Sequence, residues 1–257
     1  MLELVLIVFL QLIFFKKNAI FLDYFIYFMI KENLDNIWKK IESVCNKSGR
    51  NLNEVTLVGV TKTLSSNVIM EAVEHKLLDL AESKVQELIG KKDDIPNTVR
   101  WHFIGHLQKN KVKYIADFIY LIHSVDSFEL AKEIDRQAEK FQRQIPALVQ
   151  INISNEEAKF GVESENVYKL VKEISQLENI KVQGLMTIGT YYEDMELSRP
   201  SFRKLKTVFD ELKSLNFNGV EMKHLSMGMS NDFTVAIEEG ATMVRVGTAL
   251  FGERYYG

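Results

Sequence analysis

The feature of this 257-residue chain that most restricts its fold is a regular alternation of short apolar runs with amphipathic segments. Each apolar run is nearly continuous, which is the pattern of parallel strands that are buried on both faces. These runs predict strands over residues 54–61, 77–81, 99–104, 120–124, 147–153, 181–188, 222–226 and 243–246. Apolar residues at three- and four-residue spacing predict helices between them, over residues 66–75, 85–91, 107–118, 128–141, 165–177, 201–215 and 233–239.

About eight strand–helix repeats favour an α/β fold made of a single (β/α)8 TIM-type barrel. A further amphipathic helix, predicted over residues 31–48, precedes the first strand and adds an extra N-terminal helix. An open doubly wound sheet is the alternative, but no Gly-x-Gly-x-x-Gly turn follows the first strand. We therefore expect one barrel domain over residues 29–257.

Residues 1–28 form an apolar N-terminal extension whose composition differs from that of the rest of the chain. Its first apolar run ends at Lys16, short of the roughly 20 residues that span a bilayer. Glu3 precedes the run and no small-residue cleavage site follows it, which argues against a secretory signal. We expect the extension to be non-native, the product of a mis-set start, with translation beginning at Met29. A membrane anchor or interfacial helix is the less favoured alternative.

The charge balance excludes several classes of partner. The chain has 32 Lys and Arg against 35 Asp and Glu, a net charge of −3, so it has no overall attraction to nucleic acid or to an anionic membrane. Cys45 is the only cysteine, which excludes an internal disulfide and a cysteine metal cluster and favours a reducing cytoplasm. The helices show no interface stripe, so a monomer is expected.

Small-residue turns follow two late strands, and a lysine follows the first strand. The turns contain Ser226 and Gly228 in one case and Gly247 and Thr248 in the other. Glycine lets backbone amides approach an anion, and barrel enzymes often bind phosphate after their seventh and eighth strands. Lys62, at the end of the first strand, would supply an amine that can attack a carbonyl. Ordinary turn and capping residues, with a solvated lysine, are the alternative interpretation.

Other polar residues give weaker signals. Arg245 lies on the last strand, where a buried arginine needs a carboxylate or a ligand as its partner. His102, His106, His123 and His224 are scattered over different elements without metal-ligand spacing, which favours structural histidines. The basic run over residues 109–113 lacks interleaved aromatic residues and is best explained as a solvated helix face.

Several of these segments together resemble the pyridoxal phosphate homeostasis protein family. The matching segments cover residues 60–62, 101–108, 150–153, 184–188, 225–232 and 243–252. The resemblance extends in order over about residues 31–257. It implies a barrel like the N-terminal domain of alanine racemase, with pyridoxal 5′-phosphate (PLP) as the cofactor.

The resemblance also implies roles for individual residues. Lys62 matches the lysine that holds PLP as an internal aldimine. Ser226, Gly247 and Thr248 match phosphate-binding positions, and we expect Gly228 to contribute to the same turn. Arg245 matches the arginine that faces the pyridine nitrogen, where it keeps that nitrogen unprotonated and weakens the ring as an electron sink.

One segment departs from the family pattern. Where the family has Phe-Gly-Glu-Asn, this chain has Leu80, Ala81, Glu82 and Ser83. Ser83 therefore stands where an asparagine lies near the cofactor ring. Serine is shorter and keeps one hydroxyl, so we expect a changed affinity for PLP rather than a different cofactor.

Two functions are compatible with these residues. The family resemblance implies a non-catalytic PLP-binding protein that maintains the intracellular supply of the cofactor and releases it to apo PLP-dependent enzymes. The alternative is an amino-acid racemase of the alanine racemase type. Two-base racemisation needs a second acid/base on the other face of the substrate, which that family takes from a second domain. No residues remain after the last predicted strand to build such a domain, so we expect no established catalytic activity.

Overall fold

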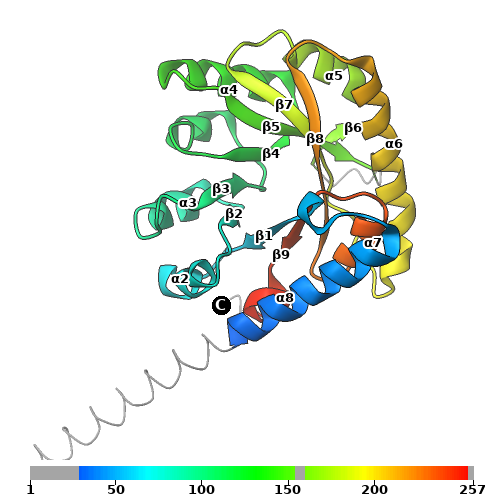
Figure 1. The fold of residues 1–257 in the computed structure, drawn as a ribbon. Helices are drawn as coiled ribbons and strands as arrows, with labels where there is room; N and C mark the ends of the chain where they lie inside the picture. The colour runs from blue at the N-terminus through cyan, green and yellow to red at the C-terminus, as the bar shows by residue number, and fades with distance from the viewer. Residues whose placement is uncertain (1–28, 154–159, 254–257) are drawn as a thin grey trace, which may run out of the picture.

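The computed structural model describes residues 29–153 and 160–253, and Figure 1 shows their arrangement. The prediction of a non-native extension concerns residues 1–28 and lies outside the described residues. Within the described residues, α-helix covers residues 29–48, close to the helix predicted over residues 31–48. None of the helices within the described ranges is both long enough and apolar enough to span a bilayer.

Eight parallel strands close into a barrel, which confirms the predicted fold class. The order around the barrel is β4-β3-β2-β1-β9-β8-β7-β5, and pairing of β4 with β5 completes the circle. The strands are β1 (Thr56–Val60), β2 (Asp79–Glu82), β3 (Arg100–Phe103), β4 (Leu121–Val125), β5 (Ile145–Asn152), β7 (Ile180–Met186), β8 (Val220–Met229) and β9 (Met243–Val246). The two-residue β6 (Val162–Glu163), which the sequence did not predict, pairs with the end of β5.

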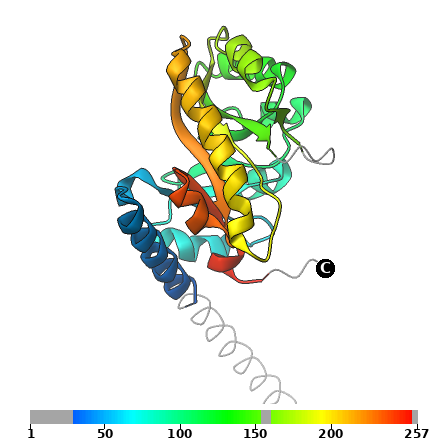
Figure 2. The same cartoon turned by 90° about the vertical axis from the view of Figure 1, so that its right-hand side faces the viewer.

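Helices surround the strands on the outside of the barrel (Figures 1 and 2). They are α2 (Ser66–Glu74), α3 (Val85–Lys92), α4 (Phe128–Lys140), α5 (Val167–Ile174), α6 (Arg199–Leu215), α7 (Phe233–Glu238) and α8 (Thr248–Phe251). Three 3-10 helices, η1 (Leu52–Glu54), η2 (Lys109–Tyr114) and η3 (Met195–Ser198), complete the described elements.

The prediction of a helix over residues 107–118 is wrong in both the type and the length of the helix. The structure has η2 there, a 3-10 helix of six residues followed by turns. Lys109 and Lys113 would be four residues apart on an α-helix, where like charges destabilise it. Val112, Ile115 and Ile119 are instead buried from successive tight turns.

The strands place their side chains alternately outward, against the helices, and inward. On β1, Leu57 belongs to the large outer core, whereas Val58 and Val60 belong to a small apolar cluster inside the barrel. Several buried polar residues lie on the inward-facing side of their strands, and the residues next to them in sequence belong to the outer core. Those polar residues are His102, His123, Ser226 and Arg245.

The N-terminal helix is tied to the last elements of the barrel and lies beside α8 in Figure 1. Asn33 donates from Nδ2 to the carbonyl of Leu250 at 2.9 Å. Arg50, just after this helix, donates from one Nη1 to the carbonyls of Ile237 and Ala241, both at 2.8 Å. These bonds satisfy carbonyls at the end of α7, and they join the first helix to the closing strand.

We predict that Arg50→Met lowers the free energy of unfolding by about 2 kcal/mol, because two buried carbonyls lose a charged donor. Urea unfolding followed by circular dichroism measures the difference. Lys47→Met, which changes an exposed lysine near the end of the same helix, is the matched control. Equal stability of the two variants would contradict the role given to Arg50.

Candidate functional site

The backbone on either side of Lys62 is held by hydrogen bonds to β2 and α3. Thr61 donates its amide to the carbonyl of Ala81 at 2.9 Å and its hydroxyl to Oε1 of Glu82 at 2.7 Å. Thr63, with a φ of 66°, donates its amide to Oε2 of Glu87 at 2.7 Å. A positive φ is rare for a β-branched residue and persists only where the surroundings impose it. Lys62 itself is half-buried.

A buried lysine joins these anchoring groups. Lys91 donates from Nζ to the carbonyl of Thr61 at 3.0 Å, to Glu82 at 2.7 Å and to Glu87 at 3.2 Å. Burial raises the pKa of Glu82, against the opposing hydrogen bonds from Lys91 and Thr61. Glu87, which is more exposed, keeps a lowered pKa: burial is outweighed there by hydrogen bonds from the Thr63 amide and Lys91. The cluster therefore fixes the chain direction at Lys62.

The turns after β8 and β9 meet through one hydroxyl group. Ser230 accepts at Oγ from the amides of Gly247 and Ala249, both at 3.2 Å. Since both amides use the oxygen as an acceptor, the Ser230 hydroxyl hydrogen remains to donate to another group. The Thr248 amide, between the two amides that Ser230 binds, has no acceptor among the described residues. This arrangement leaves several donors that suit an anion.

Gly228 shapes the first of these turns. Its φ is 87°, and a Cβ added there would lie 2.5 Å from the Cβ of Ala236 on α7. Only glycine allows both this backbone conformation and the close approach of α7. Gly228 thus acts on the path of the backbone, and Ser230 emerges two residues later.

One cavity of about 690 Å³ brings most of the predicted site residues together. Of these residues, Lys62, Ser83, Arg245, Gly247 and Thr248 line it, together with Ser230. The rest of the wall comes from Val60, Ile104, Gly105, Ile188, Tyr191, Tyr192, Met229, Asn231, Asp232 and Ala249. A volume of this size lies within the usual range for small-molecule sites. The residues at the ends of β1, β2 and β9 therefore share a single pocket, as the sequence predicted.

Ser226 and Gly228 are the two predicted site residues that do not line the cavity. Ser226 is fully buried inside the barrel. Its hydroxyl contacts Nη1 of Arg245 at 2.6 Å and Nδ1 of His123 at 2.9 Å. Ser226 thus lies behind Arg245, and Ser230 occupies the turn where the sequence predicted Ser226.

Arg245 links the cavity to the barrel interior. Its second nitrogen, Nη2, donates to the carbonyl of Thr187 at 2.8 Å. The side chain is nearly fully buried, and this burial lowers the pKa of Arg245 to about 10 although the charge of Asp232 acts in the opposite direction. The guanidinium remains protonated at neutral pH and can only donate.

Behind Ser226, polar side chains continue across the barrel. Nε2 of His123 lies 2.9 Å from Nδ1 of His102, whose Nε2 lies 3.0 Å from Oδ1 of Asp79. Asp79 also accepts from Nε of Arg100 at 2.7 Å. Burial alone would raise the pKa of Asp79, but the hydrogen bonds from Arg100 and His102 outweigh it and hold the pKa at about 2. Both histidines are fully hydrogen-bonded inside the barrel, and they are connected to the cavity-lining Arg245 through Ser226.

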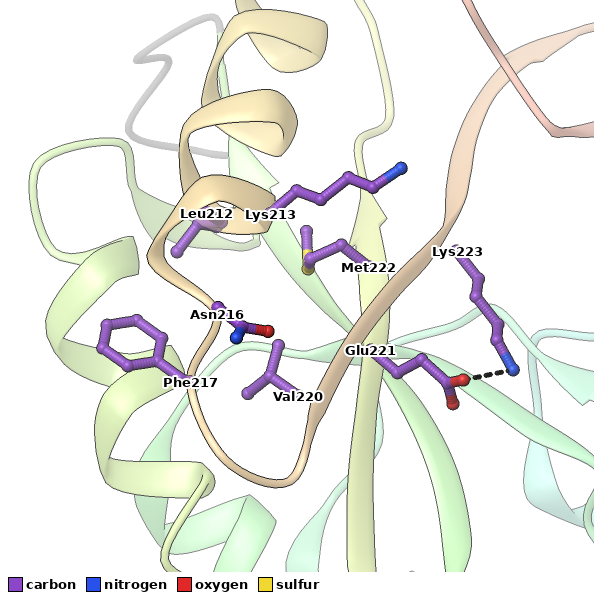
Figure 3. A pocket seen from close by; sticks show the side chains of 8 residues that line it. All are labelled: Leu212, Lys213, Asn216, Phe217, Val220, Glu221, Met222 and Lys223. Atoms are coloured by element: carbon purple, nitrogen blue, oxygen red, sulfur yellow. Dashed lines mark ion pairs between the residues drawn. The ribbon is translucent and has the colours of Figure 1, made fainter.

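A second, smaller cavity of about 400 Å³ lies between the end of α6 and the start of β8 (Figure 3). Glu221 there accepts from Lys223 at 2.6 Å and from Lys181 at 2.8 Å. These pairs satisfy the charges, and none of the predicted site residues lines this cavity. Across the described ranges, no group of three or more potential ligands is placed to hold a metal ion.

Comparison with known proteins identifies relatives along almost the whole described chain. The family model for the alanine racemase N-terminal domain matches residues 33–255. The pyridoxal phosphate homeostasis protein of Aquifex aeolicus is 46% identical over 226 residues, covering 88% of this chain and 98% of the relative. The Escherichia coli protein of the same name is 32% identical over 238 residues, covering 88% and 97%.

Solved structures agree with this assignment. The structure of PipY from Synechococcus elongatus PCC7942, with PLP bound, is 31% identical and superimposes with a TM-score of 0.75, covering 87% of this chain and 100% of PipY. Alanine racemase of Clostridium difficile is 17% identical with a TM-score of 0.72, covering 88% of this chain and 57% of the racemase. At that identity the racemase shows a shared fold alone.

The lowered pKa of Asp79 predicts a specific loss of stability in acid. A carboxyl whose pKa falls from 3.8 to about 2 on folding stabilises the folded state above pH 4, and the stabilisation disappears as the pH falls toward 2. The contribution amounts to about 2 kcal/mol. We expect Asp79→Asn to lower stability at pH 7 and to flatten the loss between pH 4 and 2. Urea unfolding across that range tests this, with exposed Asp117→Asn as the control; identical pH slopes for Asp79→Asn and the unchanged protein would contradict it.

Proposed function

The chain belongs to the pyridoxal phosphate homeostasis protein family, and from this premise we propose that it binds PLP in the cavity between Lys62 and the turns after β8 and β9. The observation that carries the proposal is that an amine, a buried guanidinium and a set of anion donors line one pocket. PLP offers a group for each: an aldehyde, a ring nitrogen and a phosphate. The residues present therefore suit this cofactor, which supplies a reactive aldehyde when bound.

Each protein group has a distinct role in this proposal. Lys62 would hold the aldehyde carbon through Nζ as a Schiff base, with the carbonyl oxygen leaving as water, and its backbone is fixed by the Lys91 cluster. The phosphate would be bound by the hydroxyls of Ser230 and Thr248 and by the Thr248 amide, since the Gly247 and Ala249 amides already donate to Ser230. Ser83 lines the cavity and stands in for the usual asparagine beside the ring.

Arg245 decides what the bound cofactor is suited to do. A guanidinium donates to a ring nitrogen but cannot accept a proton from it. The ring nitrogen then stays unprotonated, and the ring is a weaker sink for the electrons of a carbanion. Arg245 therefore favours holding PLP over catalysing reactions with it. The protein would act as a monomeric cytoplasmic reservoir that maintains PLP homeostasis and passes the cofactor to apo PLP-dependent enzymes.

Covalent attachment at Lys62 is the first test. We expect the protein incubated with PLP to absorb in the visible range, and borohydride to fix the cofactor on Lys62, as read by peptide mass spectrometry. Lys62→Ala should abolish both signals, whereas Lys84→Ala, which changes an exposed lysine nearby, should preserve them. Recovery of the reduced adduct on a different lysine would refute the assignment.

Phosphate binding is tested by removing the hydroxyls that line the cavity. Each lost hydrogen bond to a charged group weakens binding by about 1.5–3 kcal/mol, so Ser230→Ala and Thr248→Ala should each raise the Kd for PLP at least tenfold. Equilibrium titration by absorbance measures the change, with exposed Ser214→Ala as the control. A Kd that stays at the control value in both variants would place the phosphate elsewhere.

A racemase activity is the alternative to a holding role. The protein shares the fold of alanine racemase, so we test whether it also racemises amino acids. Sustained interconversion of alanine or serine enantiomers by the pure protein, lost in Lys62→Ala, would replace the non-catalytic proposal with an enzymatic one.

A further inference from the structure

The polar side chains inside the barrel form a continuous line from its outer surface to the cavity. Arg100, with 44% of its side chain exposed, contacts Asp79 at one end. From there the line passes through His102, His123 and Ser226 to Arg245. The two imidazoles and Ser226 are fully buried, so the links between them are shielded from water.

We propose that Asp79, His102 and His123 are positioning residues that orient Arg245 through Ser226, by a chain of hydrogen bonds that all point the same way. The part of this inference that concerns PLP rests on the proposed function. The part that concerns the direction of the hydrogen bonds rests on the side chains alone.

The acceptor at one end of this chain of hydrogen bonds determines its direction. Asp79 is a carboxylate and can only accept, so His102 carries its proton on Nε2 and donates it to Oδ1. Nδ1 of the neutral His102 then accepts from Nε2 of His123, which leaves Nδ1 of His123 to accept the hydroxyl hydrogen of Ser226. At the other end Arg245 can only donate, and Ser226 accepts from its Nη1. No link is then left with two donors or two acceptors.

Neutral histidines are required for this chain, and the surroundings keep them neutral. Burial lowers the pKa of His102, against the hydrogen bond from Asp79. The pKa of His123 lies well below its usual range, because of burial and then the positive charge of Arg245 and the charge that His102 would carry if protonated. An extra proton on His102 would set an N–H on Nδ1 against the N–H of His123 and break the chain.

The chain of hydrogen bonds affects the cavity because it holds the planar guanidinium of Arg245 in one orientation. Arg245 has five N–H donors in a rigid plane, and its bonds to Ser226 and to the Thr187 carbonyl fix that plane. The remaining donors are thereby fixed toward the cavity that Arg245 lines. Loss of the Ser226 bond would leave Thr187 as the only anchor, about which the group can turn.

Removal of polar groups far from the cavity should therefore change how Arg245 behaves. We choose His123→Asn, which interrupts the chain next to Ser226, and Asp79→Asn, which removes its charged acceptor at the far end. The matched control is His224→Asn. His224 lies on β8 two residues before Ser226 and has no side-chain hydrogen bond within the described part of the chain.

The first measurement needs no cofactor, and its test of the histidine protonation needs no variant. In nitrogen NMR spectra of the cofactor-free protein, His102 and His123 should both be neutral and protonated on Nε2, and the Arg245 guanidinium should rotate slowly. His123→Asn should speed that rotation, whereas His224→Asn should not. A charged imidazolium, or a proton on Nδ1 of either histidine, would refute the proposed direction of the hydrogen bonds. This result comes from the unchanged protein, so it does not depend on whether the variants fold.

The second measurement uses PLP itself. We expect His123→Asn to raise the Kd for PLP roughly tenfold and to shift the absorption of the bound cofactor, because Ser226, without its bond to His123, no longer holds Arg245 in place. Asp79→Asn should change both in the same direction by a smaller amount. A folded His123→Asn variant that matches His224→Asn in Kd, spectrum and Arg245 rotation would refute the positioning role. If the unchanged protein fails to bind PLP, the proposed function is refuted, and with it the part of this inference that concerns the cofactor. The NMR result would still test the direction of the hydrogen bonds between Asp79 and Arg245.

Discussion

The site depends on one strand pairing, that of β1 with β9, which closes the first and last strands of the barrel against each other. Their register is continuous, from Thr56 opposite Met243 to Gly59 opposite Val246. Because the strands are parallel and in register, the residues that follow them emerge at the same rim. Lys62 and the turn at Gly247 and Thr248 are far apart in the sequence and become neighbours only through this closure. An open sheet with the same local elements would not require them to meet.

The strands and most of the helices could be predicted from the sequence because buried positions must be apolar, which produces recognisable apolar patterns. Strands buried on both faces must be nearly continuous apolar runs, and all eight barrel strands lie close to such runs. The elements that the sequence did not predict include β6 and η2, which have no comparable pattern. The residues of β6 are paired at the end of β5 rather than buried in the sheet, and η2 buries its apolar residues from tight turns instead of a regular helical face.

The residues of the cavity were predicted in outline, with an informative difference at the turn after β8. Residue types at strand ends indicated Lys62, Gly247 and Thr248, and an arginine on a buried strand indicated Arg245. The family resemblance implied Ser83, and all five residues line the cavity. Ser226 was expected there because the predicted strand ended at residue 226. The observed β8 continues to Met229 through Gly228, whose positive φ gives no signal in a pattern of apolar runs. The hydroxyl that reaches the turn is therefore Ser230, and Ser226 points into the barrel. The connected histidines could not be predicted, since each stands alone on its strand and they meet only where strands bring the inward-facing residues together.

The kinds of protein group around the cavity favour holding a ligand over transferring protons. A racemase needs an acid/base pair shielded from water on both sides of its substrate. Among the titratable residues that line this cavity, Arg245 can only donate, and Asp232 already accepts the amide of Met229 at 2.7 Å. Tyr191, with 72% of its surface exposed, is not shielded from water. Meanwhile the groups that surround Lys62 and Arg245 are engaged in bonds that fix position: the Lys91 cluster on one side and the chain from Ser226 to Asp79 on the other. Rigid donors with little capacity to accept protons therefore fit the proposed role of holding a cofactor better than the proton transfers of a racemase.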